Sequence, residues 1–340
     1  MIVSSRFFIA CGFALAGSVL LASPVFAKNN SEKVTFETVD EVELQGTFYP
    51  SNQGMKAPCV LMLHDLSSNN GSVAWNEWAT LTATLQRNGF AVLQFDFRGY
   101  GKSTTVHPAF WKAPDNGKIR GATLRKSEIH YRDLPASYLP VLVNDIAAAR
   151  RFLDSQNDAK QCNSRNLILI GAQEGATLGA LWLATEWQRR PPRQNGLNLP
   201  PYGEDVAAAV WLSILPTLGH SRRPEFRVDK WLGPLRDRTP MFFFYGEEDR
   251  TASALATELC ERVLRIDVPP RPKSTGLKGF KTPAAGAGLL GQRSLAADEK
   301  ILNYLSNVLE SRDDQTWVDR GTKRIQENFV NLKPFGLPAH

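Results

Sequence analysis

Apolar runs of strand length alternate with amphipathic segments of helix length along most of this chain. Several runs are apolar at nearly every position, which is typical of strands buried on both faces beneath covering helices. These runs open the segments 57–65, 90–103, 166–184, 206–215 and 239–252. The pattern predicts an α/β fold, with a mostly parallel, doubly wound sheet and helices on both faces.

Three helices and an opening hairpin complete the predicted framework. Segments 34–38 and 41–50 alternate apolar and polar residues with a period of two, which predicts an antiparallel pair. Helices are predicted over 75–89, 139–156 and 296–311. In the second helix, four apolar residues recur at helical spacing and share one face: Leu142, Ile146, Ala149 and Leu153.

The N-terminus has the layout of a secretory signal peptide. Arg6 precedes an apolar run at 7–21, and small residues at Val25 and Ala27 mark a cleavage site after Ala27. The alternative is an uncleaved membrane anchor, but glycines, serines and a proline weaken a spanning helix there. We therefore expect an extracytoplasmic protein, periplasmic or secreted, with no stable membrane span after cleavage.

The 340 residues divide into a signal peptide at 1–27, an α/β domain at 28–311 and a C-terminal tail at 312–340. Insertions at about 103–138 and 216–239 interrupt the domain. No linker-like run divides the domain further, and a chain of this length can bury one large core. One domain is therefore expected.

Charge and cysteine content exclude several classes of protein. The net charge of +6 is spread over the chain without a nucleic-acid-binding motif, so no nucleic-acid partner is expected. Cys59, Cys162 and Cys260 form no C-x-x-C pair, and no H-x-x-H motif occurs, so we expect neither a metal nor another cofactor. Cys59 lies in an apolar run and is expected in the core, while the disulfide state of the three cysteines stays open.

Five motifs in order resemble those of the α/β-hydrolase superfamily, most closely its dienelactone-hydrolase-like and peptidase-like esterases. They are TVDEVELQG with Glu41 in place of a glycine, LMLHD with Asp65 in place of a glycine, DFRGYGKS, GAQEG and YGEEDRTA. The resemblance extends from about residue 34 to residue 310. It implies the α/β-hydrolase fold and places a catalytic site at the ends of these strands.

The segment GAQEG, residues 171–175, stands where the family has its nucleophile turn, G-x-S-x-G. In that turn, side chains two positions before and after the tip would collide with the backbone, and Gly171 and Gly175 avoid this. Gln173 therefore occupies the tip. Its amide nitrogen is delocalised into the carbonyl, so Gln173 cannot replace a serine or cysteine nucleophile.

The base of the triad is also missing from its expected place. The resemblance assigns the acid to Asp249 and aligns Ala285 with the histidine in the segment KTPAAGAGLLG. The only histidine after Asp249 is His340, and Lys278 or Lys281 are the alternatives for a base. Without a histidine to orient, Asp249 is expected to be a turn residue that accepts backbone hydrogen bonds.

The oxyanion side of the site is expected to involve His64, Asp65 and Glu174. The family uses the backbone N–H of the residue after the tip, here Glu174, as an oxyanion donor, with its side chain directed elsewhere. Asp96 and Arg98 are expected to organise their loop, and Ser103 and Ser213 lack the flanking glycines of a nucleophile turn. The other histidines are expected in surface loops: His107, His130 and His220.

These observations predict a pseudo-hydrolase that binds a small molecule or a protein through the former active-site cleft. The alternative is a working esterase or peptidase-like hydrolase in which a carboxylate among Asp65, Glu174 and Asp249 activates water. Both insertions are basic, which favours an anionic ligand or partner. The first insertion forms either a lid, with Phe110, Trp111 and Tyr131 facing the cleft, or a solvated surface loop.

Overall fold

The computed structural model describes residues 30–67, 71–191, 199–221, 223–269, 274–322 and 328–337. The predicted signal peptide and His340 lie outside these residues. Among the described residues, no helix has the length and apolar character needed to cross a membrane.

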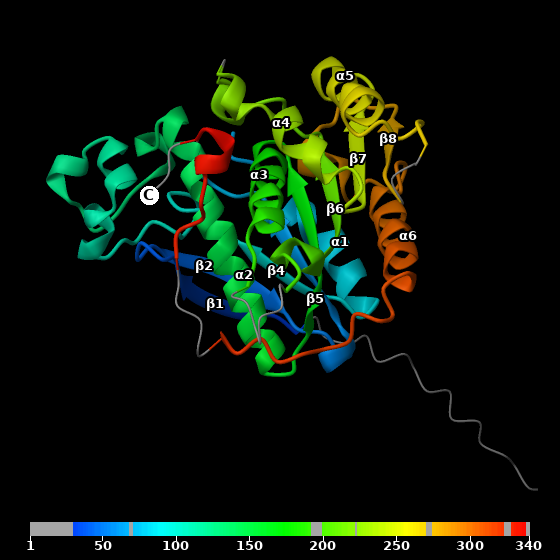
Figure 1. The fold of residues 1–340 in the computed structure, drawn as a ribbon, viewed down its shortest axis with the longest axis horizontal. Coiled ribbons are helices and arrows are strands. Elements are labelled where there is room, and N and C mark those ends of the chain that lie inside the picture. The colour runs from blue at the N-terminus through cyan, green and yellow to red at the C-terminus, as the bar shows by residue number, and fades with distance from the viewer. Residues whose placement is uncertain are drawn as a thin grey trace, which may run out of the picture.

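An eight-stranded sheet forms the centre of the protein, in the order β1-β2-β4-β3-β5-β6-β7-β8 (Figure 1). Strand β2 is antiparallel to both β1 and β4, and the other neighbours are parallel. The predicted fold class is therefore confirmed. The strands are β1 (Glu32–Glu37), β2 (Glu43–Tyr49), β3 (Pro58–Leu63), β4 (Ala91–Phe95), β5 (Asn163–Ala172), β6 (Val206–Leu212), β7 (Met241–Gly246) and β8 (Gly276–Phe280).

Strand β8 was not among the strands predicted from the sequence. It lies at the edge of the sheet, and only Leu277 and Phe280 among its five residues are large and apolar. An edge strand pairs on one side only, so its sequence lacks the continuous apolar run that identifies a central strand.

Helices cover both faces of the sheet. Helices α1 (Trp75–Arg87) and α6 (Ala297–Glu310) enclose one apolar cluster. The other face is covered by α2 (Val143–Asp158), α3 (Glu174–Gln188), α4 (Val228–Leu232) and α5 (Arg250–Glu258). Helix α3 is buried along almost its whole length because it lies between the sheet and its neighbouring helices. The helix that begins at the tip residue is thus held in the core.

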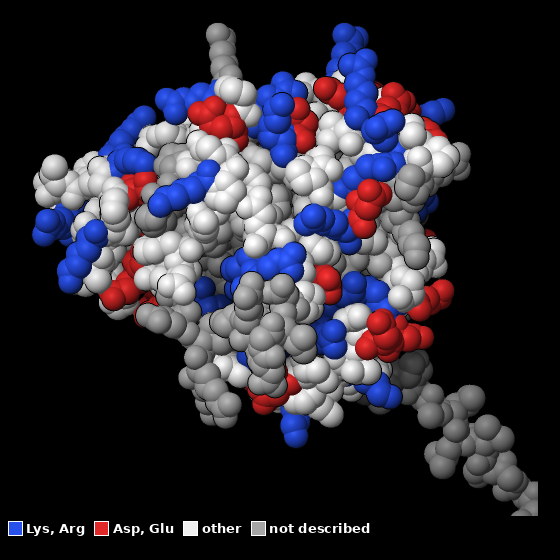
Figure 2. All heavy atoms as spheres, viewed as in Figure 1, with Lys and Arg blue, Asp and Glu red and all other residues white. Residues whose placement is uncertain are grey.

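The first insertion, residues 103–138, projects from the domain as a lobe of short 3-10 turns (Figure 1). The turns are η2 (Pro108–Lys112), η3 (Pro114–Lys118), η4 (Ala122–Leu124) and η5 (Tyr131–Asp133), followed by η6 (Ala136–Leu142), which leads into α2. Phe110, Ile119 and Ile129 are buried and anchor the lobe. Figure 2 shows Lys and Arg side chains along its outer edge.

A buried polar cluster, the Arg98 network, fastens the lobe to the domain. The Arg98 guanidinium lies 2.7 Å from Asp40 and donates to Asp145 from Nε at 2.7 Å. The lobe contributes Asn116, which donates to Asp40 at 2.9 Å, and Tyr138, which accepts from Arg98 at 2.8 Å. The expectation that Arg98 organises its loop is met, and the network also joins the lobe to the opening hairpin and α2.

The described parts of the C-terminal tail lie against α2. The Trp317 indole donates to the Asn157 carbonyl at 2.9 Å, and the Arg320 backbone N–H donates to Asp158 at 2.6 Å. These bonds attach the tail beside the amino ends of the parallel strands, away from the nucleophile turn.

Candidate functional site

Gln173 occupies a strained turn between β5 and α3, with φ 47° and ψ −117°. Residues other than glycine rarely adopt this conformation, and it persists only where the surrounding structure enforces it. A Cβ atom on Gly171 would lie 2.6 Å from Ala176 Cα, and one on Gly175 would lie 2.2 Å from the His64 carbonyl oxygen. The glycine spacing thus has the steric cause inferred from the sequence, and the turn has the geometry of a nucleophile elbow.

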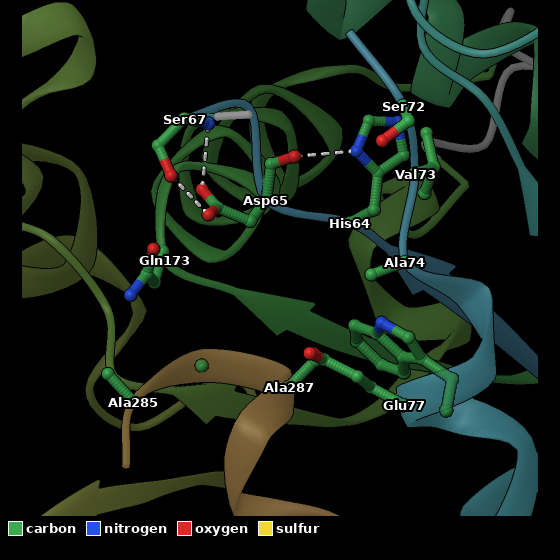
Figure 3. Close-up of a pocket in the computed structure, with 12 residues that line it drawn as sticks. His64, Asp65, Ser67, Ser72, Val73, Ala74, Glu77, Gln173, Ala285 and Ala287 are labelled. Atoms are coloured by element: carbon green, nitrogen blue, oxygen red, sulfur yellow. Dashed lines mark hydrogen bonds between the residues drawn. The ribbon is translucent and has the colours of Figure 1, made fainter. Parts of the chain in front are cut away.

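Gln173 lines a cavity of about 260 Å³, the elbow pocket. Its walls come from the segment after β3, the start of α1 and the loop after β8, all gathered near the carboxyl end of β5 (Figure 3). No hydrogen bond engages the Gln173 amide within the described part of the chain, so the amide is available to a ligand. The lining residues are His64, Asp65, Ser67, Ser72, Val73, Ala74, Glu77, Trp78, Gln173, Ala285, Gly286 and Ala287.

Ala285 lines the same pocket as Gln173 (Figure 3). Its neighbour Gly286 lies so near the tip that an added Cβ would be 3.1 Å from Gln173 Cγ. A side chain longer than alanine at position 285 would therefore enter the pocket beside the tip. Lys278 and Lys281, the alternative base candidates, are exposed and do not line the pocket.

Asp249 caps helix α5. Its carboxylate accepts hydrogen bonds from the backbone N–H groups of Thr251 at 3.1 Å and Ala252 at 3.0 Å. Asp249 does not line the elbow pocket, although the Glu248 N–H in the same turn donates to the Thr282 carbonyl at 3.4 Å. The turn thus touches the loop that carries Ala285, while the Asp249 side chain acts as a helix cap.

His64 is locked in a single tautomer. The Phe97 N–H donates to His64 Nε2 at 3.0 Å, so the ring proton is on Nδ1 and is donated to the Asp65 carbonyl 2.7 Å away. Burial lowers the pKa of the imidazole, and the rings of Trp75, Phe97 and Tyr100 surround it. Both nitrogens are occupied, so His64 stabilises the turn after β3 and cannot serve as the missing base.

Asp65 and Glu174 form a carboxyl pair at the edge of the pocket. Glu174 is 4% exposed, and its Oε2 is buried without a hydrogen-bond partner. Burial, a hydrogen bond with Asp65 and the Asp65 charge together raise the pKa of Glu174 to about 8. Asp65 also accepts from the Ser67 backbone N–H at 3.1 Å. The pair thus holds a proton near neutral pH, and no ion pair with a described cation compensates its charge.

The charged side chains that line the described part of the elbow pocket are acidic. They are Asp65 and Glu77, and no described residue of either basic insertion is among the lining residues. Of the lobe aromatics expected to face the cleft, Phe110 is fully buried and Tyr131 packs against Tyr100, with ring centroids 5.5 Å apart. The described lysines and arginines of the insertions are not among the lining residues, so the expectation of an anionic ligand or partner, which rests on the insertions, stays a prediction.

Sequence patterns missed the contribution of α1. Glu77 and Trp78 line the pocket from its first turn, and Ser67 and Ser72 line it from the preceding loop. Glu77 in the first turn of a helix is ordinary, since acidic residues stabilise that end. Nothing in its spacing therefore distinguished a pocket residue from a surface one.

The remaining candidates lie apart from the pocket. Ser103 accepts a hydrogen bond from the Gln45 N–H at 2.8 Å, and Ser213 is buried behind the end of β6. His107 and His130 are exposed beside glutamates, as expected. The described residues contain no cluster of histidine, cysteine and acidic side chains that could hold a metal ion. Cys59 is buried, as predicted, and so are Cys162 and Cys260.

No family model and no curated protein matches the chain in sequence. Among solved structures, the esterase Pf2001 of Pyrococcus furiosus matches with a TM-score of 0.53 and 16% identity, covering 82% of this chain and 91% of the esterase. DcsB, solved with its substrate analogue, matches with a TM-score of 0.52 and 14% identity, covering 82% and 99%. The dienelactone hydrolase of Anabaena variabilis matches with a TM-score of 0.50 and 16% identity, covering 83% and 97%.

At 14–16% identity, these likenesses concern the fold alone. The strand order, the conformation at Gln173 and the structural matches agree with one another. The chain therefore has the fold of the α/β-hydrolase superfamily, with glutamine at the tip of its nucleophile elbow.

Proposed function

We propose that this protein is an exported pseudo-hydrolase that binds a small molecule in the elbow pocket and performs no acyl transfer. The observation that supports this most directly is Gln173 in the strained elbow conformation. The fold retains the costly backbone geometry that presents a nucleophile, while the side chain presented there has no oxygen that a base can activate.

The surroundings of Gln173 support the same proposal. Ala285 supplies no base, and both nitrogens of His64 are engaged in hydrogen bonds. The carboxyl pair lies beside the pocket, where its negative charge would oppose the developing oxyanion of an acyl-transfer reaction. Among the described residues, the nucleophile and base positions of the elbow thus carry side chains that cannot perform acyl transfer, and the oxyanion side carries an acidic pair.

The chemistry of the pocket favours a small ligand with a cationic or hydrogen-bond-donating group. Asp65 and Glu77 supply carboxylate oxygens, and Ser67 and Gln173 supply further polar groups. A cavity of about 260 Å³ is smaller than most drug-sized ligand sites, so the bound group must be compact. An ammonium group fits this lining, since carboxylates bind it through charge-assisted hydrogen bonds.

One observation favours a second function, hydrolysis by water. A carboxyl group with a pKa near 8 can exchange protons at neutral pH, and Glu174 is such a group beside the pocket. In this alternative, the pair of Asp65 and Glu174 activates water without a covalent intermediate. The Glu174→Gln variant separates the two functions, because it abolishes hydrolysis of this kind but leaves a binding protein folded.

The first test is reaction with a fluorophosphonate probe and turnover of short acyl esters. The wild-type protein is expected to show neither, whereas an active serine esterase assayed in parallel shows both. Stoichiometric labelling of any serine overturns the proposal. Ester turnover without labelling, lost in Glu174→Gln, instead establishes the carboxylate mechanism.

A designed triad tests whether the elbow retains its former geometry. The double variant Gln173→Ser with Ala285→His should hydrolyse esters slowly, with Asp249 available behind the ring. Either single change should have little effect, since a serine without a base stays protonated. Adding Asp65→Gly should raise the rate about tenfold by removing a charge that opposes the oxyanion. If the folded triple variant equals the parent, the assignment of Ala285 is wrong.

Ligand binding is tested by thermal shift with small alkylammonium ions and with carboxylates of the same size. The wild type should be stabilised by the ammonium series only, and Glu77→Gln should weaken the shift. Glu299→Gln, an equivalent change at an exposed position on α6, is the matched control. A shift with carboxylates instead would contradict the charge inferred for the ligand.

Export is tested separately by mass analysis of the N-terminus. The mature protein should begin near Lys28 and appear in the extracytoplasmic fraction. An intact Met1 in a membrane pellet would indicate the uncleaved anchor.

A further inference from the structure

The lobe carries a cluster of cations around an exposed leucine, and we propose that this cluster docks the protein on an anionic lipid surface. We define the basic tip as Lys112, Arg120, Leu124, Arg125 and Lys126. All five residues are exposed, and the run from Arg120 to Lys126 contains no acidic residue. The proposal is independent of the function of the elbow pocket, which the tip does not line.

Leu124 is the unusual member of the basic tip. Its side chain is 67% exposed, compared with 43% for Met55 and 39% for Val268 and Val318, the other exposed large apolar residues that the structure describes. Exposure of an isolated apolar side chain is common. Here, however, the leucine belongs to a projecting lobe and has cations on both sides of it in the chain.

Hydrogen bonds within the lobe connect the segments that carry these cations. The indole of Trp111, the residue before Lys112, donates to the Lys126 carbonyl at 2.9 Å. The Arg120 N–H donates to the Asp133 carbonyl at 2.9 Å. The segments that carry Lys112 and Lys126 are therefore in contact, and Arg120, Arg125 and Lys126 follow one another within seven residues.

Arg125 adopts a left-handed conformation, with φ 42° and ψ 48°, directly after Leu124. A residue with a Cβ atom adopts this conformation at a cost. The turn ends the short helix η4 and leaves Leu124 and Arg125 at the surface, because it reverses the chain there.

The base of the lobe holds the tip in a fixed position. Phe110, Ile119 and Ile129 are buried, and the Arg98 network joins Asn116 and Tyr138 of the lobe to the domain. The lobe that carries the tip projects from the domain (Figure 1), and Lys and Arg side chains line its outer edge (Figure 2). A preformed cationic surface binds without the entropic cost of ordering a flexible loop.

The combination of one exposed leucine with surrounding cations favours a lipid surface over a protein as the partner of the tip. A leucine among lysines and arginines matches an interfacial anchor, in which the apolar group enters the headgroup region and the cations attract anionic lipids. A stable protein interface needs a larger apolar centre than one side chain. The exposed acid nearest in sequence, Glu128, lies 4.0 Å from His130, and Asp115 is paired with Lys118, so each of these two acids has a basic neighbour of its own.

The test is sedimentation of the protein with vesicles of phosphatidylcholine alone or with roughly one third phosphatidylglycerol. The form that begins at Lys28 is used throughout, so that residues of the signal peptide do not contribute. We expect binding to the anionic vesicles at low salt, little binding to the neutral ones, and loss of binding as salt rises. The tip variant Arg120→Glu/Arg125→Glu/Lys126→Glu should bind at least about tenfold more weakly.

The matched control is Arg262→Glu/Arg293→Glu/Lys300→Glu, which makes the same change in net charge at exposed positions on another part of the protein. It should bind within about twofold of the wild type, and Leu124→Ser should weaken binding less than the tip variant does. Equal weakening in control and tip variants reduces the effect to net charge and overturns the proposal. Absence of vesicle binding by folded wild-type protein overturns it too, leaving an acidic protein as the remaining class of partner.

Discussion

The Arg98 network and the carboxyl pair are both buried polar clusters beside ends of neighbouring strands, but they differ in charge balance. In the Arg98 network, a guanidinium lies between Asp40 and Asp145, and Asn116 and Tyr138 complete the hydrogen bonds. In the carboxyl pair, Asp65 and Glu174 meet without a cation, and one oxygen of Glu174 lacks a partner. The first arrangement supports structure, whereas the second is costly to folding.

The pKa values of Asp40 in the Arg98 network and of Glu174 in the carboxyl pair shift in opposite directions, although burial also raises the pKa of Asp145, the second acid of the network. Burial opposes ionisation of Asp40, but the charge and hydrogen bonds of Arg98, with those of Asn116 and Thr38, outweigh it and lower the pKa of Asp40 to about 2. Burial and Asp65 raise that of Glu174 to about 8. A strongly perturbed group beside a cavity is a sign of function, whereas a satisfied pair is a sign of architecture.

The largest effect on stability is expected from removing the guanidinium of the Arg98 network. Arg98→Met leaves the buried carboxylates of Asp40 and Asp145 without a cation and should lower the free energy of unfolding by about 3–5 kcal/mol. Urea denaturation measures this, with the exposed Arg262→Met as control. Arg98→Lys keeps the positive charge but not the several hydrogen bonds of the guanidinium. It should therefore lower the free energy of unfolding by less than Arg98→Met does. A loss below about 1 kcal/mol in Arg98→Met would contradict the structural role of the network.

The next effect concerns the pH dependence of stability set by Glu174. Its pKa in the folded state, about 8, exceeds the usual value of 4.5, so the folded state binds more protons between these values. The contribution of Glu174 to the free energy of unfolding is therefore fully present below about pH 4.5. It is lost as the pH rises to 8. The loss should be about 2–4 kcal/mol.

Glu174→Gln removes this ionisation and should flatten the profile between pH 5 and pH 8, measured as the free energy of unfolding at each pH. Asp40 has the opposite sign: its contribution is present above pH 3.8 and is lost as the pH falls toward 2. An unchanged slope in Glu174→Gln would mean that another group, and not the carboxyl pair, sets the profile.

The smallest effect comes from the backbone strain at Gln173. Gln173→Gly should raise the free energy of unfolding by about 1 kcal/mol, because relief of strain exceeds the entropy that glycine adds to the unfolded chain. Gln173→Ala keeps a Cβ atom and therefore the strain, so it separates the backbone effect from loss of the amide. Stabilisation by alanine equal to that by glycine would show that the amide, not the backbone, is unfavourable.

The sequence predicted the fold class, the order of most elements and the elbow itself. These features depend on local patterns: apolar runs in central strands, helical spacing in α2, and glycines on either side of Gln173, which no other residue can replace without a clash. Such patterns are visible along the chain because the physical cause acts within a few residues. The absence of a chemically competent tip residue was visible for the same reason.

The charge of the pocket and the proton held at its edge were decided by the tertiary structure. Asp65 and Glu174 are far apart in the chain and meet because the turn after β3 passes beside the start of α3, where Gly175 allows close approach. Glu77 reaches the same pocket from α1, and the described cations of the lobe are not among its lining residues. Electrostatic interactions depend on distance in space and on burial, and neither quantity can be obtained from spacing along a single sequence.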